Sequence, residues 1–268
     1  MESLSELADL SGRTAIVTGG AGHLGAAIGE TLAELGAAVA VVDFEETEAQ
    51  QEAERLEREY ETDTLALAED IAEEGAYDRI RERVLESFGS IDVLAHSAAL
   101  VGTSELDGWS VPFEEQLPEA WRDALEVNLT APVFLTQKCV KSLRESPIGS
   151  VFSVGSIYNM VGPDMRLYPD DGEMGNPAGY SASKGGLLQM TKWLATTLAP
   201  EIRVNMISMG GVWREQPEEF HERYLQRTPM ERMAREEDIK GAVAFLASDL
   251  SAYVTGQNLP VEGGYTVW

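Results

Sequence analysis

A strand, a glycine-rich turn and a helix follow one another near the start of this chain, and this succession constrains the fold more than any other feature. Residues 13–18 form a short apolar, β-branched run, typical of a strand buried in a parallel sheet. Gly19-Gly20-Ala21-Gly22-His23-Leu24-Gly25 follows directly, and a helical pattern then ends at Gly36. This order lets backbone N–H groups and a helix N-terminus approach a pyrophosphate, so it favours a dinucleotide site over a plain tight turn.

A second apolar run, residues 37–42, ends in Asp43 at the place where an acidic side chain can bind both hydroxyls of an adenosine ribose. A carboxylate there repels a 2′-phosphate, and the following Phe44-Glu45-Glu46 offers no arginine to receive one. We therefore expect NAD(H) rather than NADP(H). Asp43 as the N-cap of the next helix is a second interpretation, compatible with the first.

Strand and helix patterns alternate along the rest of the chain. Further strands are expected at 64–68, 91–95, 150–154, 202–207 and 253–261, with helices at about 47–60, up to 88, around 128, at 180–198 and at 236–250. No internal repeat or break in composition divides residues 1–268. We predict one α/β domain, a Rossmann fold with a doubly wound, seven-stranded parallel sheet flanked by helices, whose ligands bind at the carboxyl ends of the strands.

Tyr180 and Lys184 lie four residues apart in a run with helical character, so both side chains can point into one pocket. A phenol with an ordinary pKa of about 10 is a poor acid or base at neutral pH, and a neighbouring cation lowers that pKa. The pair is a candidate for proton transfer. The same spacing also occurs by chance on solvated helices, so its meaning depends on the surrounding motifs.

Several other polar residues follow the predicted strands. Ser156 comes after the strand at 150–154, and His96-Ser97-Ala98-Ala99 supplies small residues that let a cofactor lie close to the backbone. Pro132 inside a helical pattern predicts a kink that frees backbone carbonyls near Asn128. Asn128 would either hold a water beside this kink or be a hydrogen-bonded polar group of the core.

The charge balance excludes one class of partner. The chain has 46 acidic and 20 basic residues, a formal net charge of −26, so nucleic acid would be repelled. Two interpretations of the charge remain open: adaptation to a salt-rich cytoplasm, where cations screen self-repulsion, or an acidic mesophilic protein with solvated helix faces. We favour the first.

The apolar pattern and the cysteine content argue against a membrane protein, a secreted protein and a metal-binding protein. No apolar run approaches the ~20 residues of a membrane span, and the start of the chain lacks the apolar core of a signal peptide. We therefore expect a cytoplasmic protein without a membrane partner. Cys139 is the single cysteine, which excludes an intramolecular disulfide. The sequence has no Cys/His cluster, so we expect no metal site.

Taken together, these motifs resemble the short-chain dehydrogenase/reductase family along nearly the whole chain. They are Thr18-Gly19 to Gly25, Asp70-Ile71, Asn128, Ser156, Tyr180 with Lys184, Arg203-Val204-Asn205, and Thr255-Gly256-Gln257 with Gly263-Gly264. The resemblance implies an NAD(P)-dependent oxidoreductase acting on CH–OH groups. Tyr180 would be the general acid/base, Lys184 would lower its pKa and bind the nicotinamide ribose, Ser156 would bind the reacting oxygen, and Asn128 would position a relay water.

The resemblance also implies cofactor contacts and an assembly. The contacts would come from Gly19, Gly22, His23, Leu24, Gly25, Asp43, Asp70, Ile71, Ser97, Ala98, Tyr180, Lys184 and Val212, with Asp70 against the adenine. The chain would form a homotetramer or homodimer through its last helices and strand. Three departures from the family pattern stand out: His23 replaces a glycine, His96-Ser97-Ala98-Ala99 replaces Asn-Asn-Ala-Gly, and Met209 replaces a proline.

The segment between Ser156 and Tyr180 is longer than is usual in the family, at 24 positions. The extra residues, within about 157–178, would line the substrate pocket or form a surface excursion or oligomer contact. Their polar residues, Asp164, Arg166, Asp170 and Asp171, favour a hydroxylated substrate. A polar, amphipathic segment at about 213–232 is a candidate mobile lid.

The insertion resembles a subgroup linked to flagellin modification and nonulosonic-acid sugar pathways, through the residues at 156–158, 162–164, 168 and 174–177. This implies a polar, sugar-like or nucleotide-sugar substrate. Two alternatives remain. A 3-oxoacyl-thioester reductase usually takes NADPH, which Asp43 opposes. A catalytically silent, NAD-binding regulatory protein typically lacks the tyrosine or the lysine that this chain retains.

Overall fold

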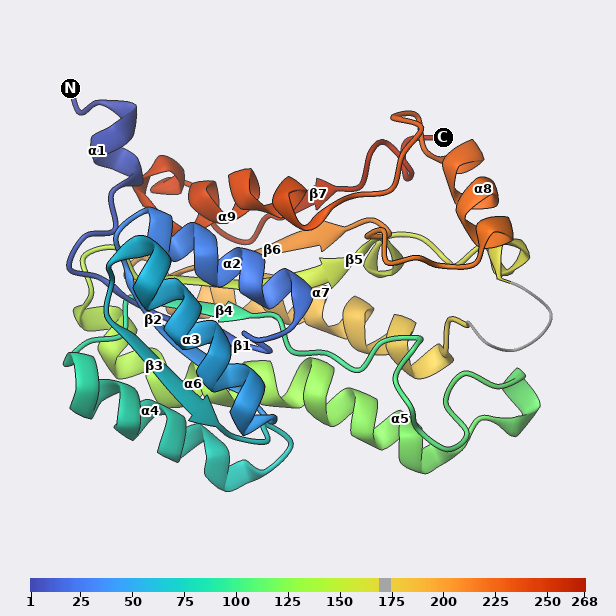
Figure 1. The fold of residues 1–268 in the computed structure, drawn as a ribbon, viewed down its shortest axis with the longest axis horizontal. Coiled ribbons are helices and arrows are strands. Elements are labelled where there is room, and N and C mark those ends of the chain that lie inside the picture. The colour runs from blue at the N-terminus through green and yellow to red at the C-terminus, as the bar shows by residue number, and fades with distance from the viewer. Residues whose placement is uncertain (169–174) are drawn as a thin grey trace.

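Seven parallel strands form one sheet in the order β3-β2-β1-β4-β5-β6-β7 (Figure 1). The computed structural model describes residues 1–168 and 175–268. The strands are β1 (Thr14–Thr18), β2 (Ala38–Asp43), β3 (Thr64–Ala68), β4 (Val93–His96), β5 (Ser150–Ser156), β6 (Arg203–Met209) and β7 (Asn258–Val261). The strand order reverses between β1 and β4, which confirms the predicted doubly wound fold and opens a crevice at their carboxyl ends.

Helices cover both faces of this sheet (Figure 1). They are α1 (Leu4–Ala8), α2 (His23–Glu34), α3 (Glu46–Tyr60), α4 (Glu74–Phe88), α5 (Pro118–Leu125), α6 (Ala131–Glu145), α7 (Ala178–Leu198), α8 (Glu218–Arg227) and α9 (Lys240–Ala247). Residues of α2, α3 and α9 share one buried cluster, and residues of α4, α6 and α7 share another on the opposite face. None of the helices within the described residues is both long and apolar enough to cross a bilayer.

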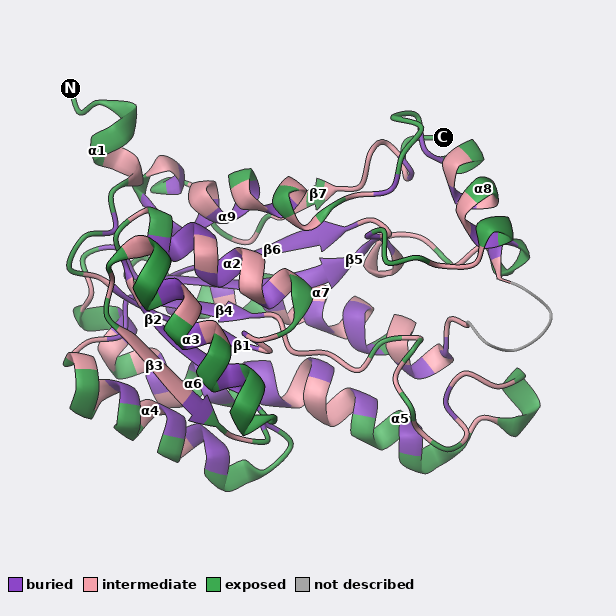
Figure 2. Ribbon diagram, in the orientation of Figure 1, coloured by how far each residue is buried: buried purple, intermediate pink, exposed green. Residues whose placement is uncertain are grey.

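Alternation along the central strands explains why two cores form. In β2, Val39 and Val41 belong to the cluster under α2, whereas Ala40 and Val42 belong to the cluster under α4 and α6. Successive side chains of a strand point to opposite faces, and a sheet covered on both faces needs apolar residues at every position. The central strands are accordingly buried along their length (Figure 2). Cys139 on α6 lies in the second cluster, fully buried.

The last helix and the last strand are both shorter than the sequence pattern predicts. The expected helix at 236–250 consists of a 3₁₀ turn (Glu236–Ile239), α9 and a second 3₁₀ turn (Asp249–Ser251). The hydroxyl of Ser248 accepts a hydrogen bond from the Leu250 N–H and caps this last turn. Strand β7 therefore begins at Asn258 rather than at residue 253, because the chain makes a further turn in which Val254 N–H donates to the Ser251 carbonyl.

The predicted kink at Pro132 takes the form of a π-helical turn, Glu126–Thr130, between α5 and α6. The Ala131 N–H donates to the Glu126 carbonyl five residues back, and Pro132 has no N–H to give to the carbonyl of Asn128. Single π turns inside helices are frequent at functional sites. This one carries Asn128, the fourth residue that the sequence predicted as catalytic.

Candidate active site

The glycine turn after β1 is so tight that side chains would not fit. A Cβ on Gly25 would lie 1.8 Å from the Gly19 carbonyl oxygen, and one on Gly19 would lie 2.7 Å from the backbone of Ala98. Gly19 also has a φ of 63°, which favours glycine. Helix α2 begins at His23 without a side-chain cap, so its first N–H groups face the crevice as an anion site.

Asp43 ends β2 with its carboxylate turned toward this glycine turn. Its Oδ2 accepts a hydrogen bond of 3.1 Å from the Ala21 N–H, and its Oδ1 accepts one of 2.9 Å from the Phe44 N–H. The N-cap of α3 is Glu45, so Asp43 is not the cap that the second interpretation proposed. An ionised carboxylate has about four acceptor positions, which leaves Asp43 free to bind ribose hydroxyls.

The other predicted cofactor residues lie along the same edge of the sheet. Asp70 is exposed after β3 and accepts a hydrogen bond from the Ala72 N–H, while Ile71 is buried below it. Ser97 follows β4 and donates its N–H to the Thr18 carbonyl at 3.1 Å. Val212 follows β6 and is held by a parallel bridge to Ala234. The predicted cofactor residues thus line the carboxyl edge from β3 to β6.

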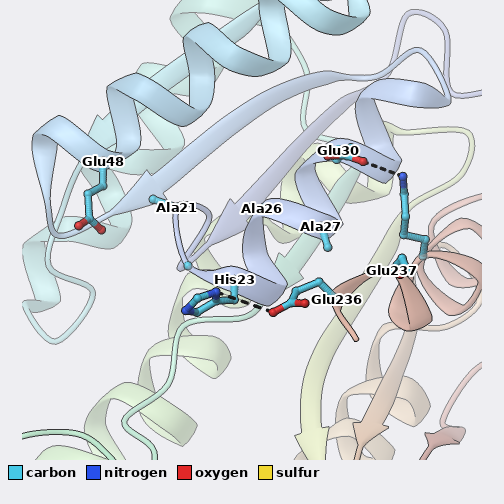
Figure 3. A pocket seen from close by; sticks show the side chains of 10 residues that line it. Ala21, His23, Ala26, Ala27, Glu30, Glu48, Glu236 and Glu237 are labelled. Carbon is cyan, nitrogen blue, oxygen red and sulfur yellow. Dashed lines mark hydrogen bonds and ion pairs between the residues drawn. The ribbon is translucent and has the colours of Figure 1, made fainter. Parts of the chain in front are cut away.

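His23 is tolerated in the turn because it is the first residue of α2 and has no left-handed backbone angle. Its imidazole turns outward, into a cavity of about 600 Å³ beside the turn (Figure 3). Nδ1 lies 3.8 Å from Oε1 of Glu236, which is also 3.4 Å from the guanidinium of Arg214. Glu236 therefore links the glycine turn to the segment that follows β6.

Helix α7 carries Tyr180 and Lys184, and β5 carries the groups that they face. The Lys184 Nζ lies 5.9 Å from the centre of the Tyr180 ring and donates a 2.8 Å hydrogen bond to the Val154 carbonyl. Val154 is two residues before Ser156 at the end of β5. The structure therefore brings together three of the four residues that sequence predicted as catalytic.

Burial sets the pKa values of this pair. Burial raises the pKa of Tyr180, and a side-chain hydrogen bond with Ser156 partly opposes that rise. This differs from our expectation, in which Lys184 lowered the pKa of the tyrosine. Burial in turn lowers the pKa of Lys184 to about 8. Burial thus makes Tyr180 a neutral phenol beside a lysine that loses its proton in weakly alkaline solution.

Asn128 joins the π turn to helix α7. Its Oδ1 accepts from the Leu100 N–H at 2.8 Å, and its Nδ2 donates to the Leu100 carbonyl at 2.9 Å and to the Ser183 Oγ at 3.1 Å. The Ser183 hydroxyl donates to the Tyr180 carbonyl at 2.8 Å. The side chain is a hydrogen-bonded core group, as one of our two interpretations held. A water would have to bind the main-chain carbonyl that Pro132 leaves without its usual donor.

The remaining departures from the family pattern lie in the core. His96 is buried, and burial lowers its pKa to about 3, so the imidazole is neutral. Its Nε2 lies 2.9 Å from the Thr136 hydroxyl, which itself donates to the Pro132 carbonyl, so the histidine donates through Nε2. Met209 is buried in the sheet cluster. His96 and Met209 therefore act as core residues of the sheet.

The inserted segment is packed onto the protein in its described part. Ile157 and Leu167 are buried with Phe220 and Tyr224 of α8, so residues 157–168 form a wall rather than a surface excursion. Sequence reasoning gave no role to Tyr158 and Tyr168, whose hydroxyls meet at 2.8 Å. Their spacing alone carries no signal for this contact.

The structure corrects our expectation for the charged residues of the insertion. Asp164 and Arg166, which we expected to favour a hydroxylated substrate, pair with each other at 2.7 Å. Asp164 also lies 3.3 Å from the guanidinium of Arg227 on α8. Their charges are therefore matched at the surface. Asp170 and Asp171 lie outside the described residues.

Comparison with known protein families gives one match that spans nearly the whole chain. A family model described as enoyl-(acyl carrier protein) reductase matches residues 19–266. The cis-4-hydroxycyclohexanecarboxylate dehydrogenase of Sinomonas cyclohexanicum is 32% identical over 259 residues, which is 95% of this chain and 96% of that protein. Glucose 1-dehydrogenase 2 of Bacillus subtilis is 28% identical, over 97% of each chain.

A third relative and one solved structure complete the comparison. The 3-oxoacyl-[acyl-carrier-protein] reductase FabG of Escherichia coli is 28% identical over 96% of this chain and 98% of its own. The crystal structure of a short-chain type dehydrogenase/reductase from Mycobacterium marinum superposes with a TM-score of 0.83 at 27% identity. That match covers 98% of this chain and 99% of the other.

Proposed function

Because the chain belongs to the short-chain dehydrogenase/reductase family, we propose that it uses NAD to interconvert a secondary alcohol and a ketone on a polar, sugar-like substrate. Membership of the family shows that the protein is an oxidoreductase of alcohols and ketones. The choice of NAD, the substrate class and the roles of the residues are our proposal. The observation that carries it is the meeting of Tyr180, Lys184 and Ser156 at the carboxyl end of β5, on the edge of the sheet that also carries the glycine turn after β1.

The glycine turn and Asp43 fit a dinucleotide. Because a Cβ at Gly19 or Gly25 would fill the turn, the backbone there can approach a pyrophosphate closely. The Asp43 carboxylate, fixed by the Ala21 and Phe44 N–H groups, would accept hydrogen bonds from the ribose hydroxyls. A 2′-phosphate would meet a buried carboxylate, which supports NAD over NADP.

Each residue of the catalytic group then has a task. In the oxidation direction, the substrate hydroxyl loses its proton to Tyr180 in its phenolate form, while the Ser156 hydroxyl donates a hydrogen bond to the oxygen that becomes the carbonyl. A bound nicotinamide would supply the acceptor for the hydride that leaves the carbon bearing this oxygen. In reduction, the Tyr180 phenol returns the proton to the carbonyl oxygen. Asn128 holds α7 in place, and its main-chain carbonyl offers a site for a relay water.

Electrostatics favours Tyr180 as an acid in the resting protein, because burial keeps the phenol neutral. To act as a base it needs a nearby positive charge, since an opposite charge favours the phenolate. Lys184 is the buried cation one helical turn away, and it carries that charge below a pH of about 8. Lys184 would also hydrogen-bond the nicotinamide ribose with the N–H groups that Val154 does not occupy.

The relatives support a polar substrate. Their names describe a hydroxycyclohexanecarboxylate, glucose and, for a 29% identical protein of Sphingobium indicum, a dichlorocyclohexadiene diol, so each substrate has more than one oxygen function. This agrees with the sugar-like or nucleotide-sugar substrate implied by the resemblance of the insertion to the flagellin-modification and nonulosonic-acid subgroup. The substrate class is proposed on these two grounds.

A second function, reduction of a 3-oxoacyl thioester, is favoured by the 28% identity to the Escherichia coli reductase. It is opposed by Asp43, if that reduction uses NADPH as is usual. A catalytically silent regulator remains the third possibility, and the complete group of Tyr180, Lys184 and Ser156 argues against it.

The test is NADH formation in concentrated KCl, with wild type and Tyr180→Phe, on sugars, nucleotide sugars and simple secondary alcohols. NADPH oxidation with acetoacetyl-CoA tests the thioester alternative. We expect turnover of polar alcohols with NAD and a loss of 10²–10⁴-fold in kcat in the variant. NADP preference together with acetoacetyl-CoA turnover would favour the second function. NAD binding without any turnover, unchanged in Tyr180→Phe, would favour the regulator.

Assembly and location belong to the same proposal. We propose a homotetramer or homodimer in the cytoplasm, formed through the last helices and strand, without nucleic acid or membrane as partners. Large apolar side chains are exposed near the C-terminus, at Val267 and Trp268. Light scattering on the purified protein would show the mass, and a monomer would contradict the proposed assembly.

A further inference from the structure

Two tyrosines of the insertion stand beside the catalytic group. Tyr158 lies two residues after Ser156, and its N–H donates to the Ser156 Oγ at 3.2 Å. Its hydroxyl meets the hydroxyl of Tyr168 at 2.8 Å, where the inserted segment returns toward the site. The two phenols are here called the tyrosine pair.

The tyrosine pair is tied to helix α7 at the position of Tyr180. Asn176 donates from Nδ2 to the Tyr168 hydroxyl at 3.4 Å, and its Oδ1 accepts from the hydroxyl of Ser181, the residue after Tyr180, at 2.8 Å. Tyr168 is also close enough to Tyr180 to raise the pKa of that phenol. The pair therefore borders the place where the reacting oxygen would lie, on the side of the insertion.

An aromatic wall holds the pair rigidly. The ring of Tyr168 packs on Phe220 at 5.5 Å between centroids, and Phe220 packs on Tyr224 at 5.9 Å. Tyr224 stacks on Tyr265 at 5.1 Å and accepts a hydrogen bond from the Gly211 N–H through its hydroxyl. Since neighbouring rings fix the position of Tyr168, its hydroxyl is preorganised rather than adaptable.

The tyrosine pair has one more O–H hydrogen than the contact between its two oxygens can use. Two phenols carry two O–H hydrogens, but only one can lie between the two oxygens. Asn176 adds a donor to Tyr168, not an acceptor. Among the residues that the structure describes, no other acceptor lies within hydrogen-bond distance of either hydroxyl. Within the described part of the chain, one O–H of this partly buried pair is thus left to donate, and burial keeps it protonated, because burial raises the pKa of both phenols.

We propose that the tyrosine pair determines specificity by donating this hydrogen bond to a second oxygen of the substrate, distinct from the oxygen that reacts. The inference deepens the proposed function and rests on it. It narrows the substrate to a compound with a hydroxyl, ether or carboxylate oxygen near the reacting carbon, such as a polyol or a hydroxy acid. A plain secondary alcohol would leave the donor without a partner, which costs binding energy.

The test compares cyclohexanol with the 1,2-, 1,3- and 1,4-cyclohexanediols, in wild type, Tyr168→Phe and Tyr158→Phe. Each phenylalanine keeps the ring and removes one hydroxyl, so the remaining phenol loses the hydrogen bond that orients its O–H toward the substrate. We expect wild type to have at least about a tenfold higher kcat/KM for one diol than for cyclohexanol, and both variants to lose this preference while cyclohexanol changes little. Tyr253→Phe, at a fully exposed tyrosine, is the matched control.

Calorimetric binding of the same alcohols to the NADH-loaded protein separates the two proposals, because it needs no turnover. A diol preference in binding that disappears in Tyr168→Phe supports the inference even if every alcohol fails as a substrate. Equal affinity for cyclohexanol and all three diols in wild type would overturn it. So would a diol preference that both phenylalanine variants retain, whatever the outcome for the reaction itself.

Discussion

The ammonium of Lys184 donates a hydrogen bond to the main-chain carbonyl of Val154 from a position with almost no exposure to solvent. A single neutral acceptor does not replace the hydration of a buried cation, so burial lowers the lysine pKa to about 8. Strand β5 thereby holds a positive charge beside Tyr180, and burial of this charge lowers the free energy of unfolding. The cost is measurable as a dependence of stability on pH.

Lys184→Met should stabilise the fold while it abolishes activity. The folded pKa of about 8 lies below the unfolded value of 10.5, so between these values the unfolded chain holds more protons and wild-type stability rises with pH. Relative to wild type, the variant should gain up to about 3 kcal/mol of unfolding free energy at pH 7, and this gain should shrink above pH 8. Urea unfolding from pH 7 to 10.5 measures it, with exposed Lys192→Met as the control.

Gly25→Ala should disrupt the turn that carries the proposed cofactor site. The added Cβ would lie 1.8 Å from a backbone oxygen, which cannot move without moving β1. We expect a loss of about 2 kcal/mol or more in unfolding free energy and weaker NADH binding. Gly241→Ala on α9, where nothing lies within 4 Å of the new Cβ, should instead stabilise by about 0.5–1 kcal/mol. Equal effects of the two substitutions would contradict the packing.

Asp43→Asn should weaken discrimination between the two nicotinamide cofactors. The amide keeps the shape and an acceptor for the Ala21 N–H, but it removes the charge that would repel a 2′-phosphate. Fluorescence titration with NADH and NADPH should show a preference for NADH in wild type that falls at least about tenfold in the variant. Glu45→Gln, exposed two positions later, removes the same charge and should leave the preference unchanged.

The thermal midpoint should rise with KCl. At a net charge of −26, carboxylates repel one another over the whole surface, and screening shortens this repulsion from about 10 Å at 0.1 M salt to about 3 Å at 1 M. Scanning calorimetry from 0.1 to 3 M KCl measures the rise. A double substitution at exposed positions, Glu57→Lys with Glu86→Lys, should flatten the curve. A flat curve in wild type would leave the acidic mesophilic interpretation.

Much of the fold could be predicted from the sequence because its signals are local. Apolar runs mark the buried parallel strands, and polar residues just after them mark the edge where ligands bind. Asp43 and Ser156 lie at the ends of β2 and β5, where these local signals put them, while their roles stay predictions. The ends of elements were less certain, since the break at Ser248 depends on one side-chain hydrogen bond.

The parts that sequence did not predict depend on contacts between distant residues. The direction of the Tyr180 pKa follows from burial, which is a property of the packed site rather than of the Tyr180 and Lys184 spacing. The contact of Tyr158 with Tyr168 crosses the insertion and is fixed by α8, which follows much later in the chain. Asp164 and Arg166 form an ion pair with each other, and the sequence does not indicate whether two nearby charges pair or bind a ligand.

The burial of Cys139 on α6 makes the protein convenient for labelling. It is the only thiol of the sequence, and burial raises its pKa to about 12, so the reactive thiolate is scarce at neutral pH and shielded from reagents. A cysteine introduced at a chosen surface position would therefore react alone with a maleimide. One fluorophore on α8, and its quenching by added ligand, would then report directly on movements of the segment beside the tyrosine pair, without a cysteine-free background having to be engineered.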